Sequence, residues 1–436
     1  MAFQQGLSGL NAASRALDVT SNNVANSATV GFKSASTHFA DVFAASIGGG
    51  GSSQVGIGAT VNAIQQQFTQ GNVTSTNNPL DISINGGGFF RMTDNGTVTY
   101  SRNGQFHLDK NGFMIDDLSR RLTGYGVDPT TGAILTATAT DLQLNPAPIN
   151  PLATGPASDP SAGVKASLNF DSRSTVPTVV PFNKDTPTSY NFSTATTIYD
   201  SLGISHSLTL YAVKAAGVGD WNVYTSVDGT DPALSDSSAA TVAGGVPVPT
   251  SLHFDTSGTL ATTTGNTASV DLASIMAVVT PGTPNGATTP LTFNINFTGS
   301  TQFGTAFGTN NLQATGYTSG NLTGVSIGSD GIIKGNYSNG QSRNLGQVVL
   351  SNFTNPNGLV SLGGNQWAET AASGTAQMGV PNSGTLGVLQ ASAVEESNVD
   401  LTAELVNMIT EQRNYQANAQ SIKTQDQIMQ TLVNLR

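Results

Sequence analysis

The stretch SNVDLTAELVNMITEQRNYQANAQSIKTQDQIMQTLVNLR, residues 397–436, decides the class of fold. Apolar side chains recur in it every seven residues, at Leu401, Met408, Tyr415, Ile422 and Met429. A second apolar set broadens this stripe: Leu405, Ile409, Ala419, Ile428, Leu432 and Val433. The spacing predicts one face of a long α-helix, with Ser397 and Asp400 as a capping box at its start. A helix over 400–436 would extend roughly 55 Å, which is typical of a coiled coil rather than of a small globule.

The beginning of the chain carries the same kind of pattern. Its apolar repeat, again seven residues apart with one intermediate position, consists of Phe3, Leu7, Leu10, Leu17 and Val24. Only Arg15 and Asp18 carry charge before Lys33. The polar face is therefore built from Gln, Ser and Asn with Ala, which lose water at a lower free-energy cost than charges do. We expect a helix that is buried on more than one side.

These two helices have either each other or neighbouring copies of the chain to pack against. Burying about ten apolar side chains gives roughly 15 to 30 kcal/mol, whereas ordering some sixty residues costs roughly 1 to 2 kcal/mol each before hydrogen bonding is counted. An intramolecular pair is thus marginal alone, and we favour polymer contacts over a self-contained core. The candidate assembly residues are Phe3, Leu7, Leu10, Leu17, Val24, Phe32, Leu401, Leu405, Met408, Ile409, Tyr415, Ile422, Met429 and Leu432.

Between the helices the sequence predicts β structure. After a Gly-rich break at 48–53, short alternating runs end in turn pairs such as Asn111-Gly112, Asp330-Gly331 and Asn339-Gly340, which favour hairpins. The Pro-rich segment 146–160 is typical of an exit into a second domain. Beyond it, 190–213 predicts two strands around a turn at 200–203, and a third strand starts at Trp221. We therefore expect an antiparallel β domain inserted into another one.

The predicted fold class is mainly β with α-helical termini: coiled-coil-like terminal helices and two antiparallel β domains, of which the outer is inserted into the inner. We expect a terminal helical domain from 1–33 and 398–436, with connecting segments at 34–71 and 366–397. The inner β domain would comprise 72–146 and 313–365, and the outer β domain 147–312. We infer the insertion because the sequence before the outer domain and the sequence after it have a similar pattern of residues.

The composition excludes several classes of function. Among 436 residues there is no Cys, which removes disulfides, thiolate nucleophiles and Cys-type zinc sites. Charged residues are 10% of the chain and the net charge is -11, with no basic cluster. This balance argues against nucleic acid and anionic membranes as partners. The first 15 residues lack the features of a cleaved signal peptide, and no run approaches the ~20 apolar residues of a membrane span.

No pattern indicates catalysis, a cofactor or a metal. His38, His107, His206 and His253 are scattered, without the spacing of a metal site. The adjacent carboxylates Asp116-Asp117 and Glu395-Glu396 diverge, so we assign the first pair to a turn and the second to the positive end of the C-terminal helix. The Gly-rich pieces at 48–51 and 86–88 lack the context of a nucleotide-binding loop. We predict a protein that is not an enzyme.

Four motifs resemble those of one known family, the bacterial flagellar rod and hook axial proteins. SNNVANSATVGFK, residues 21–33, is similar to the N-terminal signature of the family, and 397–436 to its C-terminal signature. NPLDISINGGGFF, residues 78–90, and YSRNGQFHLDKNGFM, residues 100–114, resemble its inner β domain. The length, the insertion around 190–229 and GNYSNGQSRNLGQVVLSNFTNPNGL, residues 335–359, resemble the hook members more than the distal rod members.

The resemblance implies a subunit that polymerises with itself into an extracellular tube, the hook, which is attached to the basal body and bends while it transmits motor torque to the filament for motility. It also implies export through the flagellar export apparatus without a cleaved signal peptide. Implied partners are the distal rod protein, the hook cap protein and the hook-filament junction protein. The alternatives are a distal rod subunit or, in another class, a secreted carbohydrate-binding or hydrolytic β protein.

Overall fold

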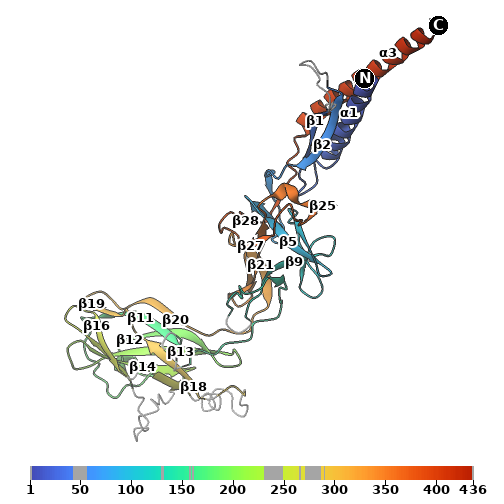
Figure 1. Cartoon of the computed structure of the whole chain (residues 1–436). Coiled ribbons are helices and arrows are strands. Elements are labelled where there is room, and N and C mark those ends of the chain that lie inside the picture. Colours follow the sequence, from blue (N-terminus) through green and yellow to red (C-terminus); the bar gives the residue numbers. More distant parts are fainter. Residues whose placement is uncertain are drawn as a thin grey trace. The chain divides into compact units, whose positions relative to one another are not determined.

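The computed structural model describes residues 2–42, 56–128, 132–156, 159, 162–229, 249–264, 267–270, 286–288 and 290–434. The expected Gly-rich break at 48–53 lies outside these residues. The chain forms two compact units. The first comprises Met1–Pro146, Leu322–Asn336 and Ser342–Arg436, and the second Ala147–Asn321 and Tyr337–Gln341. The described elements are mainly strands, with one long helix near each end of the chain (Figure 1). The predicted fold class is confirmed.

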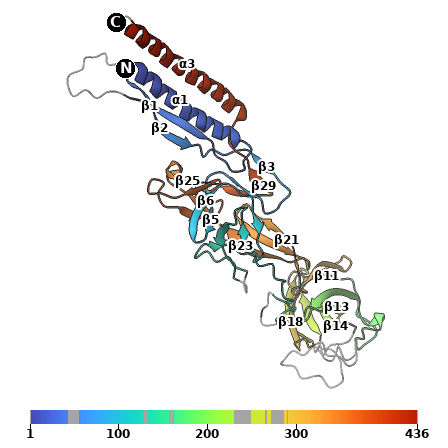
Figure 2. The same cartoon turned by 90° about the vertical axis from the view of Figure 1, so that its right-hand side faces the viewer.

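The two long helices of the first unit lie side by side (Figure 2). They are α1, Ala2–Ala25, and α3, Leu401–Asn434. On another face α1 contacts an antiparallel hairpin, β1 (Ala35–Val42) and β2 (Gly58–Gln66), which lies within the segment expected only to connect. α1 therefore has neighbours on two faces, as expected from its weakly charged polar side.

The start of α3 corrects one expectation. Asp400 Oδ1 accepts hydrogen bonds from the backbone N–H groups of Thr402 (2.9 Å) and Ala403 (3.1 Å). Asp400 is thus the N-cap residue, and the expected capping box with Ser397 as the cap is wrong. The Ser397 hydroxyl instead accepts from the N–H of Val399 at 3.3 Å, outside the helix. Both residue types cap helices well, so the sequence did not separate them.

The remainder of the first unit is a β body. Its main sheet has the order β21-β22-β23-β9-β5-β6-β26-β25, with further short strands attached to β5 and β9. Two antiparallel pairs, β4 with β28 and β3 with β29, join early to late segments of the chain. The early strands are β3 Val73–Ser75, β4 Ile82–Asn85, β5 Phe89–Asp94, β6 Thr97–Ser101, β7 His107–Leu108, β8 Met114–Ile115, β9 Arg121–Tyr125 and β10 Thr140–Asp141. The late ones are β21 Leu322–Ile327, β22 Ile332–Tyr337, β23 Ser342–Val348, β24 Leu350–Asn352, β25 Val360–Gly363, β26 Gln366–Ala368, β27 Gln377–Gly379, β28 Val388–Ala391 and β29 Ala393–Glu395, with the 3-10 turn Pro356–Gly358.

Two apolar clusters form the core of this body. The larger contains Ile82, Phe90, Met92, Leu122 and Val348 among its members, all fully buried. The smaller is aromatic and joins Phe89, Tyr100, Phe353 and Trp367. Both clusters combine residues from before and after the second unit in the sequence. The body therefore needs both halves of the chain, as an insertion requires.

The second unit contains two sheets around one apolar cluster. One sheet has the order β17-β18-β11-β19 with β20 on β11, and the other runs β12-β13-β14-β15-β16 with antiparallel pairing throughout. Trp221, Phe170 and Phe293 are fully buried between them. The strands are β11 Val164–Asp171, β12 Phe192–Tyr199, β13 Ser205–Lys214, β14 Asp220–Val227, β15 Thr250–Phe254, β16 Leu260–Thr264, β17 Thr267–Val270, β18 Leu291–Asn296, β19 Thr301–Phe303 and β20 Gly308–Ala314, with the 3-10 turn Pro187–Ser189. The strands predicted on both sides of 200–203, and the next one at Trp221, are confirmed. The expectation of an antiparallel domain is wrong for the first sheet, because β11 pairs in parallel with β18 and with β19.

Candidate assembly helices and the ionic cluster at their base

The contact between α1 and α3 is made by small residues. A Cβ atom on Gly6 would lie 3.0 Å from Ile422 Cγ1, and one on Gly9 would lie 2.8 Å from Asn418 Oδ1. Near the other end of α1, Asn23 Nδ2 donates to Glu404 Oε1 at 3.3 Å. Low numbers in α1 thus meet high numbers in α3, so the helices are antiparallel, and glycine permits their close approach.

A second face of α1 contacts the hairpin through polar side chains. Gln5 Nε2 donates to the carbonyl oxygen of Gly56 at 2.6 Å. The Ser8 hydroxyl accepts from the N–H of Ala59 at 3.4 Å. Together with the glycine contact, these bonds use the small and polar residues of α1 on its covered faces. Of the large apolar residues of the predicted stripe on α1, Phe3 and Leu7 are exposed.

The candidate assembly residues are only partly covered within a single chain. On α3 the exposed fraction of Leu405 is 44% and that of Ile409 is 52%. Other candidates classed as exposed are Phe3, Leu7, Leu401, Tyr415 and Met429. The half-buried ones are Leu10, Leu17, Val24, Phe32, Met408 and Ile422, and the side chain of Leu432 lies outside the described residues. Both helices therefore present large apolar side chains to water.

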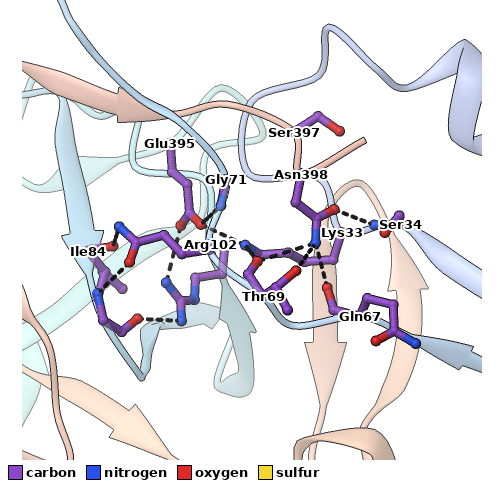
Figure 3. Close-up of polar contacts among 12 residues, drawn as sticks. Lys33, Ser34, Gln67, Thr69, Gly71, Ile84, Arg102, Glu395, Ser397 and Asn398 are labelled. Carbon is purple, nitrogen blue, oxygen red and sulfur yellow. Dashed lines mark hydrogen bonds and ion pairs between the residues drawn. The ribbon is translucent and has the colours of Figure 1, made fainter. Parts of the chain in front are cut away.

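A buried ionic cluster lies at the base of the helices, where both ends of the chain enter the β body (Figure 3). Glu395, at the end of β29, accepts from Lys33 Nζ at 2.6 Å through Oε1 and from Arg102 NH1 at 3.1 Å through Oε2. The N–H of Gly71 also donates to Oε1, at 2.9 Å. The side chains of Lys33 and Glu395 have no exposed surface.

Neighbouring hydrogen bonds extend this cluster. Lys33 Nζ also donates to the carbonyl oxygen of Thr69 at 2.7 Å, and Arg102 NH2 to that of Gly86 at 2.8 Å. Asn398 Oδ1 accepts from the N–H of Ser34 at 2.7 Å, while its Nδ2 donates to Thr69 Oγ1 at 2.9 Å (Figure 3). The segments after α1, before β3 and before α3 are thus held together by polar contacts.

The cluster contains two cationic side chains and one carboxylate. Burial lowers the pKa of Lys33 from its usual value, although the adjacent Glu395 carboxylate opposes this shift. Burial likewise lowers the pKa of Arg102, again against the effect of Glu395. Both shifts have the same cause, because removing a cation from water disfavours its charged form. Glu395 is therefore the side chain that makes the burial of both cations tolerable.

Glu395 corrects a second expectation. We expected it beside Glu396 at the positive end of the helix dipole, yet it lies in β29 and points into the β body, while α3 begins only at Leu401. Its cationic partners are 362 and 293 residues away along the chain. No local pattern in the sequence marks such a pairing, so sequence reasoning missed it.

The scattered histidines have ordinary polar partners. His206 Nδ1 lies 2.6 Å from Asp228 Oδ2, and His253 Nδ1 lies 2.5 Å from Asp220 Oδ1. Within the described ranges, no group of three or more His, Asp or Glu side chains is arranged to hold a metal ion. Neither of the described helices carries an apolar stretch that could cross a membrane.

Comparison with protein families and curated proteins gives consistent matches. Four family models match: "Flagella basal body rod protein" at residues 3–33, "Flagellar hook protein FlgE/F/G D1 domain" at 83–147, "Flagellar basal body protein FlaE D2 domain" at 169–317 and "Flagellar basal body rod FlgEFG protein C-terminal" at 390–435. The flagellar hook protein FlgE of Salmonella typhimurium is 46% identical over 440 residues and covers 100% of both chains. That of Escherichia coli is 45% identical over the same length and the same coverage.

The chain belongs to the flagellar hook protein family. The more distant hook protein of Brucella suis is 30% identical and covers 100% of this chain and 98% of its own. The crystal structure of Helicobacter pylori flagellar hook protein FlgE2 has the same fold, with a TM-score of 0.50 at 12% identity, and covers 74% of this chain and 100% of its own. As a member of the family, the chain is a structural subunit of the flagellar hook and is localised there. The distal rod and carbohydrate-binding or hydrolytic alternatives are not favoured.

Proposed function

We propose that this subunit polymerises with copies of itself into the tubular hook through its terminal helices. The observation that carries the proposal is the exposure of large apolar side chains on both helices, such as Leu7, Leu405 and Ile409. Monomeric proteins rarely leave contiguous apolar patches in water, and such patches mark contact sites. Packing between neighbouring copies removes this surface from water, at about 1.5 to 3 kcal/mol for each side chain that becomes fully buried.

All fourteen candidate residues belong to this proposed interface. They are Phe3, Leu7, Leu10, Leu17, Val24, Phe32, Leu401, Leu405, Met408, Ile409, Tyr415, Ile422, Met429 and Leu432. Ile422 lies against Gly6 within the subunit, and we expect the exposed members to contact neighbouring copies. The paired helices of one subunit would thus form a single surface that contacts neighbouring copies in the polymer.

The polymer acts as a universal joint, which bends while it transmits torque from the rod to the filament. The composition supports this role, because only 10% of the residues are charged. Neutral polar surfaces exchange direct hydrogen bonds for water-mediated ones at small cost. Subunits with such surfaces slide against one another without breaking strong ion pairs.

The remaining partners follow from the position of the hook. The distal rod protein lies at one end, and the hook cap protein and then the hook-filament junction protein at the other. The flagellar export apparatus delivers the chain without a cleaved signal peptide. The packing of Gly6 and Gly9 on α3 supports this, because a cut after the first 20 or so residues would remove most of α1. Mass spectrometry of the exported chain tests it, and a shortened N-terminus would contradict it.

Electron microscopy of the purified chain at rising concentration tests the polymer proposal. The unchanged chain should form tubes above a threshold concentration. The double variant Leu405→Ser with Ile409→Ser should stay monomeric, because it removes exposed apolar surface from α3 without creating a buried cavity. The matched control, Gln412→Ser with Gln416→Ser, changes exposed polar residues of the same helix and should form tubes. Tubes from the first variant at the usual threshold would contradict the proposal.

A further inference from the structure

The ionic cluster brings together segments that are distant in the sequence. Lys33 follows α1, Gly71 precedes β3, Arg102 follows β6, and Glu395 ends β29 a few residues before α3. The carboxylate of Glu395 accepts hydrogen bonds from the other three residues. Its backbone oxygen accepts a further one from the N–H of Gly31 at 2.7 Å. One residue therefore contacts every segment through which the helices join the β body.

The charge balance of the cluster makes Glu395 unlike its partners. Removing Lys33 leaves a one-to-one pair of Glu395 with Arg102, whereas removing the charge of Glu395 leaves two buried cations without a counter-charge. A buried charge that loses its partner is strongly unfavourable, whereas a buried pair as such contributes little to stability. The cluster is thus suited to specify one arrangement rather than to add stability.

The ionic cluster contacts the apolar core of the β body at its edge. The guanidinium of Arg102 lies 5.4 Å from the centre of the Phe89 ring, which belongs to the smaller, aromatic cluster. The larger cluster, with Phe90 and Leu122, is held together by apolar side chains. Loss of the Glu395 charge should therefore affect the base of the helices before it affects the body.

We infer that Glu395 is a positioning residue that fixes the base of the terminal helices on the β body, in a single arrangement set by its contacts with Lys33, Gly71 and Arg102. The inference goes beyond the proposed interface, because none of these residues was a candidate for contact between copies. It also holds for a single chain. Its failure can therefore be distinguished from failure of the polymer proposal.

Hydrogen exchange of the full-length chain tests the inference with Glu395→Gln, which keeps the shape of the side chain and removes its charge. The amides of Gly31, Ser34 and Gly71 should lose protection at least tenfold, while amides of β5 and β9 keep theirs. The matched control is Glu396→Gln at the next position, where the carboxylate accepts a hydrogen bond from the exposed Asn72 side chain at 3.3 Å. It should change none of these amides.

A second pair of variants separates the effect of charge from that of shape. Lys33→Met should lose less protection than Glu395→Gln, because a matched pair remains. Lys33→Met combined with Glu395→Gln should recover part of the loss seen with Glu395→Gln alone, because one unpaired cation is gone. Equal losses in Lys33→Met and Glu395→Gln would overturn the charge argument. Unchanged protection at Gly31 and Gly71 in Glu395→Gln, or an equal loss across β5 and β9, would overturn the positioning role.

Discussion

Replacing Gly9 with leucine tests whether the close approach of α1 and α3 is needed for assembly. A Cβ atom at this position already lies 2.8 Å from Oδ1 and 2.9 Å from Nδ2 of Asn418, so a leucine side chain must displace that residue. Overpacking of this kind costs about 1 to 3 kcal/mol. Leucine also favours the helix over glycine by somewhat less than ~1 kcal/mol. We therefore expect a net loss of up to about 2 kcal/mol per subunit, which corresponds to a factor of up to roughly 30 in an equilibrium constant.

Sedimentation of polymer from a concentration series measures this loss as a rise in the critical concentration. Two controls locate its cause. Gly9→Ala should be near neutral, because the gain in helix propensity offsets a small movement of the Asn418 amide. Gly9→Leu combined with Asn418→Ala should restore most of the affinity, since the space lost to leucine is returned. A critical concentration unchanged by Gly9→Leu, or unaffected by the second substitution, would refute the reasoning.

Three further outcomes are expected. Burial, with the hydrogen bond to Glu369, raises the pKa of Tyr100 to about 12 from the usual 10.0. The neutral Tyr100 hydroxyl therefore contributes stability that is complete below pH 10 and is lost as the pH rises through 12. Melting at alkaline pH should show this loss for the unchanged chain and not for Tyr100→Phe. Replacing 147–321 by a short linker should leave self-assembly intact and change the bending of the tube in electron micrographs; loss of all polymer would contradict it. Met408→Glu places a carboxylate in the half-buried seam of α3, and burying it should cost several kcal/mol per subunit. Elongation of the hook should therefore stop, while secretion and the melting of the β body stay normal. Normal hook counts on cells would contradict this prediction.

Periodicity predicted the helices well because their pattern is local. The repeat from Leu401 to Met429 lies within α3, and the repeat from Phe3 to Val24 lies within α1. Which faces are covered inside one chain could not be read from it. The helices approach closely at Gly6 and Gly9, small residues that an apolar pattern does not count.

The remaining differences concern contacts that are not local, or choices between similar residues. Asp400 and Ser397 both suit an N-cap, and only the backbone path decides between them. The hairpin of β1 and β2 packs against α1. The sequence did not reveal this packing, so we expected only a connecting segment there. The cluster of Lys33, Arg102 and Glu395 depends on three distant segments, so its charges looked like ordinary surface charges in the sequence.

The antiparallel pairing of α1 with α3 favours an order of folding in which the β body forms before the helices pair. The hydrogen bond from Asn23 to Glu404 joins residues 381 positions apart, and closing a flexible loop of that size costs about 5 kcal/mol in chain entropy. Once the β body has formed, Gly31 and Glu395 are already neighbours, and the remaining loop of about 17 residues costs only about 2.5 kcal/mol to close. Folding of the β body first therefore lowers the entropic cost of pairing the two helices, and the body serves as the template on which they meet.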